Sequence, residues 1–330
     1  MARAGPIWDG AFMRTQAGMT AGNATGARMG AEAGRIAAGV VLFGPQRDRL
    51  LGLIDAIAPD VARIYLFVNG RLDGALREEL RTLAPKVELI ESPVNFGIAT
   101  ALNLLALAAA LADFEAICLF DQDSRPGPGM VAALAATREK LVLAGAFPAI
   151  VGPLMVTPTG ESYKAPRVFR RAGEDGTAGA TPVDFLATSG SLLDIAVFRQ
   201  VGGFRDDYFI DAVDLEWCFR AWAAGFSIWL DPRQTMPHTV GEGQIRAGAV
   251  RMPRQKLFRM ATYVRNNVYG LRLRHLPRGF RARQVIYLPA QCLLYWRDQR
   301  YDLAVARRLL KAAADGLRGH LGPPADAPEN

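Results

Sequence analysis

Residues 116–124 read Ala-Ile-Cys-Leu-Phe-Asp-Gln-Asp-Ser, an apolar run that stops abruptly at two carboxylates. The apolar part is typical of a buried strand of a parallel sheet. In an extended chain, Asp121 and Asp123 point the same way. We therefore expect a divalent cation or ligand hydroxyls between the two carboxylates, which would otherwise repel each other. The alternative interpretation is an ordinary turn, because Asp and Ser are common loop residues.

Strand-like and helix-like segments alternate on both sides of this stretch. We expect strands at residues 36–43, 64–68, 87–91 and from 150, and helices at residues 48–57, 72–83, 98–111 and 129–143. This alternation predicts an α/β fold, with a doubly wound and mostly parallel sheet flanked by helices. Ligands of such sheets bind beyond the carboxyl ends of the strands. The groups at those ends, which should line one crevice, are Gly44, Asn69, Asn95 and Asp121.

The composition is that of a folded protein. The chain has 330 residues, of which 50% are apolar and 22% charged, so it can bury a sizeable core. Its three cysteines lie far apart, which argues against a disulfide framework or a zinc cluster and fits a reducing cytoplasm. No apolar run reaches the ~18 residues that a membrane-spanning helix needs. The expected parts are a disordered tail at residues 1–34, a core domain at 35–245 with halves at 35–153 and 154–245, and a basic helical region at 246–330.

Positive charge is concentrated in the last quarter of the chain. Residues 246–318 hold 15 Arg and 2 Lys against 3 Asp, a net charge of +14, whereas the whole chain carries +7. Tyr, Trp and Leu are interleaved with these basic residues, as in a helix that lies on an anionic membrane surface. A solvated basic face and a nucleic-acid-binding segment are the alternatives, and no nucleic-acid-binding motif accompanies the charge.

Several familiar motifs are absent from the sequence. There is no G-x-x-x-x-G-K-[ST] loop, which argues against a P-loop NTPase, and no G-x-G-x-x-G after the first strand, which argues against a dinucleotide-binding dehydrogenase. A G-x-S-x-G nucleophile elbow is also missing, and Thr188-Ser-Gly-Ser191 resembles it only superficially.

A second acidic group precedes a predicted helix. Apolar spacing from Val213 indicates a packed helix, and Asp211 and Asp214 lie near its N-terminus, where the helix dipole favours carboxylates. We expect Asp211 to cap the helix. An ion pair of Arg220 with Asp214 or Glu216 is the alternative to a catalytic role. A carboxylate in an apolar setting can have its pKa adjusted to serve as a general base.

In their order along the chain, these pieces resemble a family 2 glycosyltransferase with the GT-A fold and, within that family, the bacterial rhamnosyltransferases. The resemblance covers roughly residues 36–267, and the ordered set is specific although each piece alone is weak. The pieces are Val40-Val-Leu-Phe43, Val68-Asn-Gly70, Asn95-Phe-Gly-Ile-Ala-Thr-Ala-Leu-Asn103, Phe120-Asp-Gln-Asp-Ser124, Thr188-Ser-Gly-Ser191, Val201-Gly-Gly-Phe204, Phe209-Ile-Asp-Ala-Val-Asp-Leu-Glu-Trp-Cys-Phe-Arg220, His238 and Tyr263-Val-Arg-Asn266.

The resemblance implies a role for individual residues. Asp123 and Asp121 would hold Mg²⁺ or Mn²⁺, and His238 would be a further ligand or a contact to the diphosphate. Asp214 would be the general base, with Val213 standing where the family usually has Glu. The implied contacts to the nucleotide sugar are Phe43, Asn69, Asn95, Gly97, Asn103, Asp121 and Arg265. The implied contacts to the acceptor are Ser189, Gly190, Glu216 and Trp217.

The resemblance also implies an inverting enzyme of cell-surface polysaccharide synthesis. The first hypothesis is transfer of L-rhamnose from dTDP-L-rhamnose, or of another sugar from a dTDP- or UDP-sugar, to a saccharide or lipid-linked saccharide. The enzyme would work in the cytoplasm, peripherally on the inner face of the plasma membrane. Two other hypotheses remain open. One is a sugar nucleotidyltransferase, for which Phe43-Gly-Pro-Gln-Arg47 is a poor Gly-rich loop. The other is a non-catalytic basic protein that binds nucleic acid.

Overall fold

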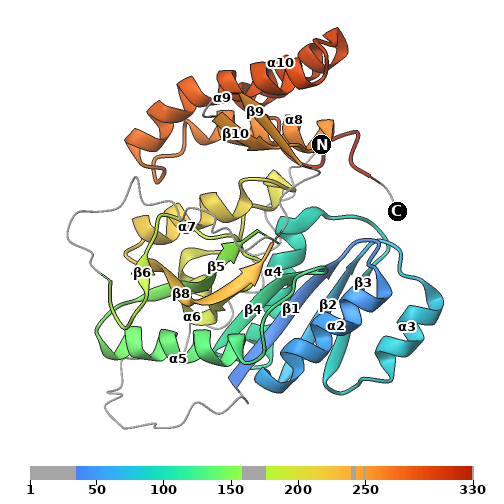
Figure 1. The fold of residues 1–330 in the computed structure, drawn as a ribbon, viewed down its shortest axis with the longest axis vertical. Helices are drawn as coiled ribbons and strands as arrows, with labels where there is room; N and C mark the ends of the chain where they lie inside the picture. Colours follow the sequence, from blue (N-terminus) through green and yellow to red (C-terminus); the bar gives the residue numbers. More distant parts are fainter. Residues whose placement is uncertain (1–34, 158–175, 239–242, 248–249, 329–330) are drawn as a thin grey trace, which may run out of the picture. The chain divides into compact units, whose positions relative to one another are not determined.

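The computed structural model describes residues 35–157, 176–238, 243–247 and 250–328. The tail expected at residues 1–34 lies outside the described residues. Figure 1 shows a large central sheet with helices packed against it and further helices formed by the last part of the chain. The predicted fold class, a mostly parallel α/β sheet flanked by helices with a helical extension, is confirmed.

The central sheet, as far as the chain is described, has eight strands. They are β1 (Ile36–Leu42), β2 (Arg63–Asn69), β3 (Val87–Ser92), β4 (Ala116–Asp121), β5 (Pro148–Val156), β6 (Thr181–Pro182), β7 (Ser191–Asp194) and β8 (Ser227–Pro237). Their order is β3-β2-β1-β4-β7-β5-β8-β6. β1 pairs in parallel with β2 and β4, whereas β7 runs antiparallel between β4 and β5. The carboxyl ends of β1, β2 and β4 therefore meet at one edge.

Helices cover both faces of the sheet. Alternate residues of each strand point to opposite faces, and apolar residues on both faces are buried under helices. In β1, Ala37 and Val41 pack with one buried cluster, whereas Ala38 and Val40 pack with the other. The first cluster includes α4 (Gly97–Leu111), α6 (Ile195–Val201) and α7 (Val213–Ala223). The second includes α2 (Arg47–Ile57), α3 (Gly74–Arg81) and α5 (Met130–Leu143), and the short 3₁₀ helix η2 (Ala58–Asp60) follows α2.

The structure confirms the strands and helices expected between residues 36 and 153, with small shifts at their ends. The helix expected at residues 72–83 begins later, at Gly74, because the Asp73 side chain accepts a hydrogen bond from the Leu76 N–H and caps it. The strand expected at 116–120 extends to Asp121, which is thus the last residue of β4.

The last part of the chain adds the hairpin β9 (Gln244–Ala247) and β10 (Val250–Pro253), then α8 (Leu257–Gly270), α9 (Arg278–Asp298) and α10 (Leu303–Arg318). The boundary expected between residues 245 and 246 falls inside β9. These elements share a buried cluster that includes Met260, Leu288 and Leu309. No helix in the described ranges is long and apolar enough to cross a membrane.

Candidate donor site at the carboxyl edge of the sheet

A cavity of about 410 Å³ lies at the carboxyl ends of β1, β2 and β4. Its lining residues are Val41, Phe43, Asn69, Asn95, Gly97, Ile98, Asp121, Gln122, Phe209, Ile210, Gln255, Lys256, Phe258, Arg259 and Pro328. Of the four groups expected to share a crevice, Asn69, Asn95 and Asp121 line it, whereas at the end of β1 Phe43 does so in place of Gly44. Two elements therefore face each other here, the sheet edge and the start of α8.

Asn69 and Asn95 form a fixed amide pair on the wall of the cavity. The Asn69 Nδ2 donates to the Asn95 Oδ1 at 3.0 Å, and the Asn69 Oδ1 accepts from the Phe96 N–H at 2.8 Å. The Asn95 Oδ1 also accepts from the Gly97 N–H at 2.9 Å. Both amides are held in one orientation, which suits groups that read a ligand's hydrogen-bonding pattern.

The group that lies close to Gly97 is the backbone of Phe209, and not a ligand. Its φ is +81°, and a Cβ atom there would lie 2.5 Å from the Phe209 carbonyl oxygen. That oxygen accepts from the Ile98 N–H at 2.8 Å, at the start of α4. A side chain at position 97 would therefore separate α4 from the loop that contains Phe209.

The two carboxylates after β4 do not continue an extended strand. The Ser124 N–H donates to the Asp121 carbonyl at 3.0 Å, so the chain turns at once, and the expectation that both side chains point the same way was wrong. Asp121 lines the 410 Å³ cavity, whereas the exposed Asp123 lines a separate hollow of about 360 Å³ beside α2. The pKa of Asp121 is raised by burial, and His238 lowers it while Asp123 raises it further.

Ser189 and Gly190 lie behind this turn. The Ser189 hydroxyl accepts from the Asp121 N–H at 3.2 Å and lies 2.8 Å from the Ser124 hydroxyl. The Gly190 N–H donates to the Leu119 carbonyl at 2.6 Å, and its backbone packs against Met236. In this structure the two residues brace the acidic turn.

The donor set around Asp121 fits a hard divalent cation only together with a ligand. Within the described residues, no group of three or more His, Cys, Asp or Glu side chains could hold a metal ion. Mg²⁺ and Mn²⁺, however, commonly bind through one or two carboxylates and complete their shell with water and substrate phosphates. In the 410 Å³ cavity Asp121 is the carboxylate that meets that description, whereas Asp123 lines a separate hollow and His238 is linked to Asp121 through its effect on the pKa of that carboxyl.

Asp214 stands in the first turn of α7, electrostatically coupled to Asp121. The pKa of Asp214 is raised to about 6: burial is the largest cause, the charges of Asp211 and Asp121 add to it, and a hydrogen bond from the Leu215 N–H opposes it. Arg259 acts in the opposite direction, since its guanidinium interacts with Asp211, Asp121 and Asp214 together. Asp214 is therefore within electrostatic range of Asp121 and Arg259, although it is not among the residues that line the 410 Å³ cavity.

The structure corrects the expected role of Asp211. The N-cap residue of α7 is Ala212, and no side chain caps the helix. Asp211 instead binds Arg259, with 2.5 Å between its Oδ1 and the Arg259 Nη2. Of the two pairs proposed for Arg220, the one with Glu216 forms, at 3.0 Å.

Asn266 holds the loop before α7. Its Nδ2 donates to the carbonyl oxygens of Tyr208, Ile210 and Asp211 at 2.9–3.0 Å. Asp211 and Ala212 both have positive φ values, +65° and +61°, which costs free energy and persists only where the surroundings enforce it. The hydrogen bonds from Asn266, on α8, hold this strained backbone in place.

Two residues predicted to contact the nucleotide sugar, Arg265 and Asn103, lie outside the 410 Å³ cavity. Arg265 does not line the 410 Å³ cavity; its guanidinium donates to the carbonyls of Gly322 at 2.6 Å and of Tyr208 at 3.2 Å. Asn103 is fully buried and bonds the Phe204 backbone through both ends of its amide. These positions do not support the expected contacts of either residue with the nucleotide.

Glu216 and Trp217 likewise point into the protein. Glu216 is buried against Arg220 and His275, and its pKa is lowered by hydrogen bonds from both in spite of burial. Trp217 is fully buried, and its ring packs against Phe198 and Phe204. A fully buried indole cannot meet an acceptor, so the structure does not support this contact.

Sequence reasoning missed Arg259, Lys256 and Phe209 as cavity residues. Lys256 is the N-cap residue of α8 and Arg259 lies in its first turn, and both line the cavity. The signal available in the sequence was the high density of positive charge after residue 246, which did not indicate which cations face the sheet.

The chain is similar to known proteins in sequence and in fold. No family model matches the chain. The chain is 27% identical over 289 residues to the dTDP-rhamnosyl transferase RfbF of Shigella flexneri, covering 86% of this chain and 95% of that protein. It is 25% identical over 227 residues to the N-acetylglucosaminyl-diphospho-decaprenol L-rhamnosyltransferase of Mycobacterium tuberculosis, covering 59% and 72%.

Two solved structures share the fold. S. aureus TarS 1–349 in complex with UDP-GlcNAc matches with a TM-score of 0.55 and 12% identity, covering 86% of this chain and 81% of that one. GalNAc-T7 with UDP, GalNAc and Mn²⁺ matches with a TM-score of 0.54 and 13% identity, covering 73% and 51%. At such identities the likeness shows the fold alone.

Together, the fold and the named relatives define the class: the protein is a glycosyltransferase with the GT-A fold. The resemblance to rhamnosyltransferases, expected from the ordered motifs, is confirmed by the similarity to both relatives. The sugar nucleotidyltransferase and nucleic-acid-binding hypotheses gain no support from these comparisons.

The role of Asn103 can be tested through stability. Asn103→Ala leaves the buried Phe204 N–H and carbonyl without their partner, and we expect the free energy of unfolding to fall by about 1–3 kcal/mol in urea denaturation. Nucleotide affinity of the folded protein should not change. The matched variant Asn95→Ala, on the cavity wall, should show the reverse pattern. If Asn103→Ala keeps its stability but loses nucleotide affinity, Asn103 contacts the nucleotide sugar, as first expected.

Proposed function

We propose that the protein transfers L-rhamnose from dTDP-L-rhamnose, with inversion, to a saccharide or lipid-linked saccharide in cell-surface polysaccharide synthesis. The observation that carries the proposal is the cavity in which Asn69, Asn95 and Asp121 face the cations of α8. The relative named dTDP-rhamnosyl transferase supports the choice of sugar and nucleotide. The relative named for a diphospho-decaprenol acceptor supports a lipid-linked acceptor.

The donor is expected to lie along the cavity with its nucleoside at the amide pair. Asn69 and Asn95 can exchange hydrogen bonds with a base or ribose. The diphosphate would then reach the side of the cavity that holds Lys256 and Arg259. These cations replace Arg265 as the proposed diphosphate contacts, and they favour departure because the leaving group gains negative charge.

Asp121 and Asp123, with His238 as a further ligand, are the residues proposed to hold Mg²⁺ or Mn²⁺. When bound, such an ion neutralises charge on the diphosphate. The pKa of Asp121 is raised mainly by burial and to a smaller extent by the charge of Asp123, so a bound cation would favour its ionised form.

Asp214 is proposed to remove the proton of the acceptor hydroxyl. That oxygen attacks the anomeric carbon from the face opposite the diphosphate, forming one carbon–oxygen bond as the bond to phosphate breaks. The nucleoside diphosphate leaves with the electron pair, and Asp214 keeps the proton. Its pKa of about 6 leaves it largely ionised near neutrality yet still able to accept a proton.

The donor assignment predicts which product is released. With dTDP-L-rhamnose, an acceptor and Mg²⁺ or Mn²⁺, we expect nucleoside diphosphate and no pyrophosphate, and activity should be lost in EDTA. Asp123→Ala should need much more metal for half-maximal rate, because one carboxylate is removed. The exposed Asp55→Ala on α2 serves as control and should behave as wild type. Release of pyrophosphate would instead identify a nucleotidyltransferase.

The base assignment predicts a pH profile. Below about pH 6 Asp214 is protonated, so kcat should fall about tenfold per pH unit as the pH drops through that value. Asp214→Asn should lower kcat by about 10²–10⁴-fold without changing the affinity for nucleoside diphosphate. Asp206→Asn, on the same loop, is the control. An unaltered acid limb in Asp214→Asn, measured on residual activity, contradicts the assignment.

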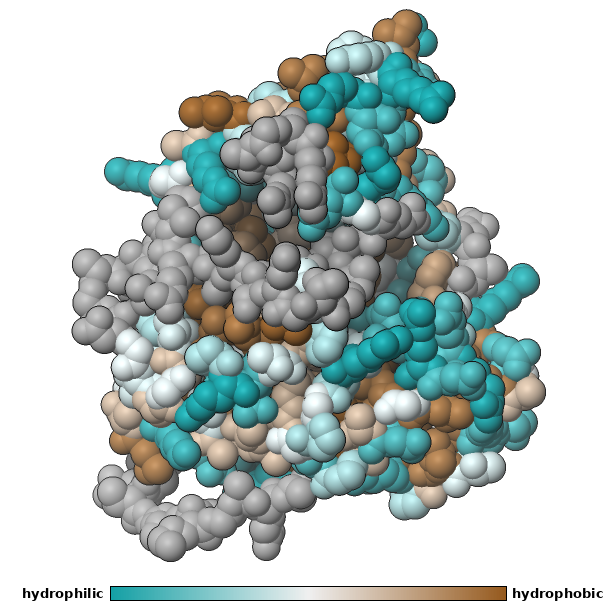
Figure 2. All heavy atoms as spheres, viewed as in Figure 1, coloured by the Kyte–Doolittle hydropathy of each residue, from teal (hydrophilic) through white to brown (hydrophobic). Residues whose placement is uncertain are grey.

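The C-terminal helices are proposed to dock on the anionic inner face of the plasma membrane. Ile286 and Leu293 of α9 are exposed, as are Leu303, Leu310 and Leu317 of α10, which recur every seven residues. Figure 2 shows brown apolar side chains interspersed with teal polar ones over this part of the surface. Basic residues with exposed apolar side chains suit the interface of a bilayer that carries negative lipids.

The docking proposal predicts a defined loss of vesicle binding. Ile286→Asp with Leu293→Asp should weaken cosedimentation with phosphatidylglycerol vesicles by about tenfold or more, since each aliphatic side chain contributes roughly 1.5–3 kcal/mol when buried. Leu143→Asp, at an exposed position of α5, is the matched control. Unchanged binding by the double variant, or equal binding to neutral vesicles, would contradict docking through this surface.

A further inference from the structure

Residues 319–328 leave the end of α10 and run back to the donor cavity; we call this segment the strap. It begins at Gly319, whose φ of +77° ends the helix. Leu321 packs against the buried cluster that includes α4. The Gly322 N–H donates to the Asp207 carbonyl at 2.6 Å, and the Gly322 carbonyl accepts from Arg265 at 2.6 Å. The first part of the strap is thus fixed by buried and charged partners.

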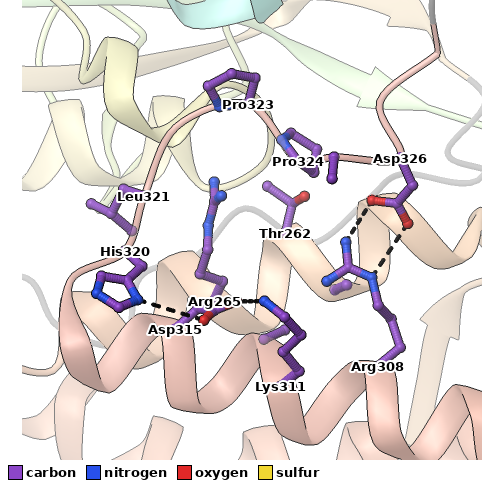
Figure 3. A pocket seen from close by; sticks show the side chains of 13 residues that line it. Thr262, Arg265, Arg308, Lys311, Asp315, His320, Leu321, Pro323, Pro324 and Asp326 are labelled. Carbon is purple, nitrogen blue, oxygen red and sulfur yellow. Dashed lines mark hydrogen bonds and ion pairs between the residues drawn. The ribbon is translucent and has the colours of Figure 1, made fainter.

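The second part of the strap has weaker anchors. Figure 3 shows residues 321–326 passing over a cavity of about 540 Å³ between α8 and α10. Arg308 binds Asp326 there, with 2.5 Å between the Arg308 Nη2 and the Asp326 Oδ1, and both side chains remain partly exposed. Exposed pairs of this kind contribute little to stability. The contacts described therefore hold residues 323–328 less firmly than Gly322.

The strap ends on a residue of the donor cavity. The Pro328 carbonyl accepts from the Asn95 Nδ2 at 3.1 Å, and Pro328 lines the cavity. The Asn95 Oδ1 is already used by Gly97 and Asn69. Nδ2 is therefore the group that Asn95 can offer to a ligand, and in this structure the strap binds one of its two N–H donors.

We propose that the strap competes with the nucleoside of the donor for Asn95, so that residues 323–328 act as a built-in inhibitor that the donor displaces. The proposal rests on the proposed function, because it takes the 410 Å³ cavity as the nucleotide site. Arg265, whose predicted diphosphate contact the structure does not support, gains a role here: it fixes Gly322 and so keeps the competing segment close to the cavity.

The test compares nucleotide affinity with and without the second part of the strap. Isothermal titration of dTDP and UDP with Mg²⁺ is carried out on the full chain and on a chain that ends at Gly322. Removing one competing hydrogen bond should lower Kd about twofold to tenfold. In the full chain, Arg308→Gln should shift Kd in the same direction, and the control Arg307→Gln, at an exposed neighbouring position, should not.

A double-mutant cycle separates competition from other effects. On an Asn95→Ala background the truncation should leave Kd unchanged, since the shared partner is gone. Weaker binding by the truncated chain would make the strap a wall of the site and overturn the proposal, as would equal binding. Failure of every nucleotide to bind either chain overturns the donor site together with the strap, whereas equal binding overturns the strap alone.

Discussion

The position of Asp214 depends on how the backbone of residues 208–211 is held. On one side, the Phe209 carbonyl accepts from the first turn of α4, where only glycine at position 97 leaves enough room. On the other side, the Asn266 amide, on α8, donates to the carbonyls of Tyr208, Ile210 and Asp211. The strained turn at Asp211 and Ala212 follows and leads into α7, so α4 and α8 both hold the loop that precedes Asp214.

The fold of the first half follows from local patterns in the sequence. Continuous apolar runs such as residues 116–120 are typical of buried parallel strands, and strand–helix alternation leaves few topologies. Ligands of such sheets bind beyond the carboxyl ends of the strands, and this rule correctly predicted that Asn69, Asn95 and Asp121 line one cavity. The rule depends on strand direction and not on the details of the side chains. The prediction that Asp214 is the base still depends on the resemblance to rhamnosyltransferases and on the geometry described here.

The errors concern side chains whose partners are distant in sequence. Arg259 pairs with Asp211 across 48 residues, and Asn103 bonds Phe204 across 101, so neither partner can be read from a local pattern. Arg265 matched a family motif, yet its guanidinium binds backbone carbonyls of two separate loops. Asn103 carried a usable signal: it lies in the buried stretch of an apolar helix, where a polar side chain commonly satisfies a backbone partner.

A crystal structure with Mn²⁺ and dTDP tests the central claim most directly, because manganese can be located by its anomalous scattering. We expect the ion at the carboxylates of Asp121 and Asp123, the base and ribose at Asn69 and Asn95, and the diphosphate within hydrogen-bonding distance of Arg259. Nucleotide in the cavity beside Arg265, or manganese away from the turn after β4, would contradict the account.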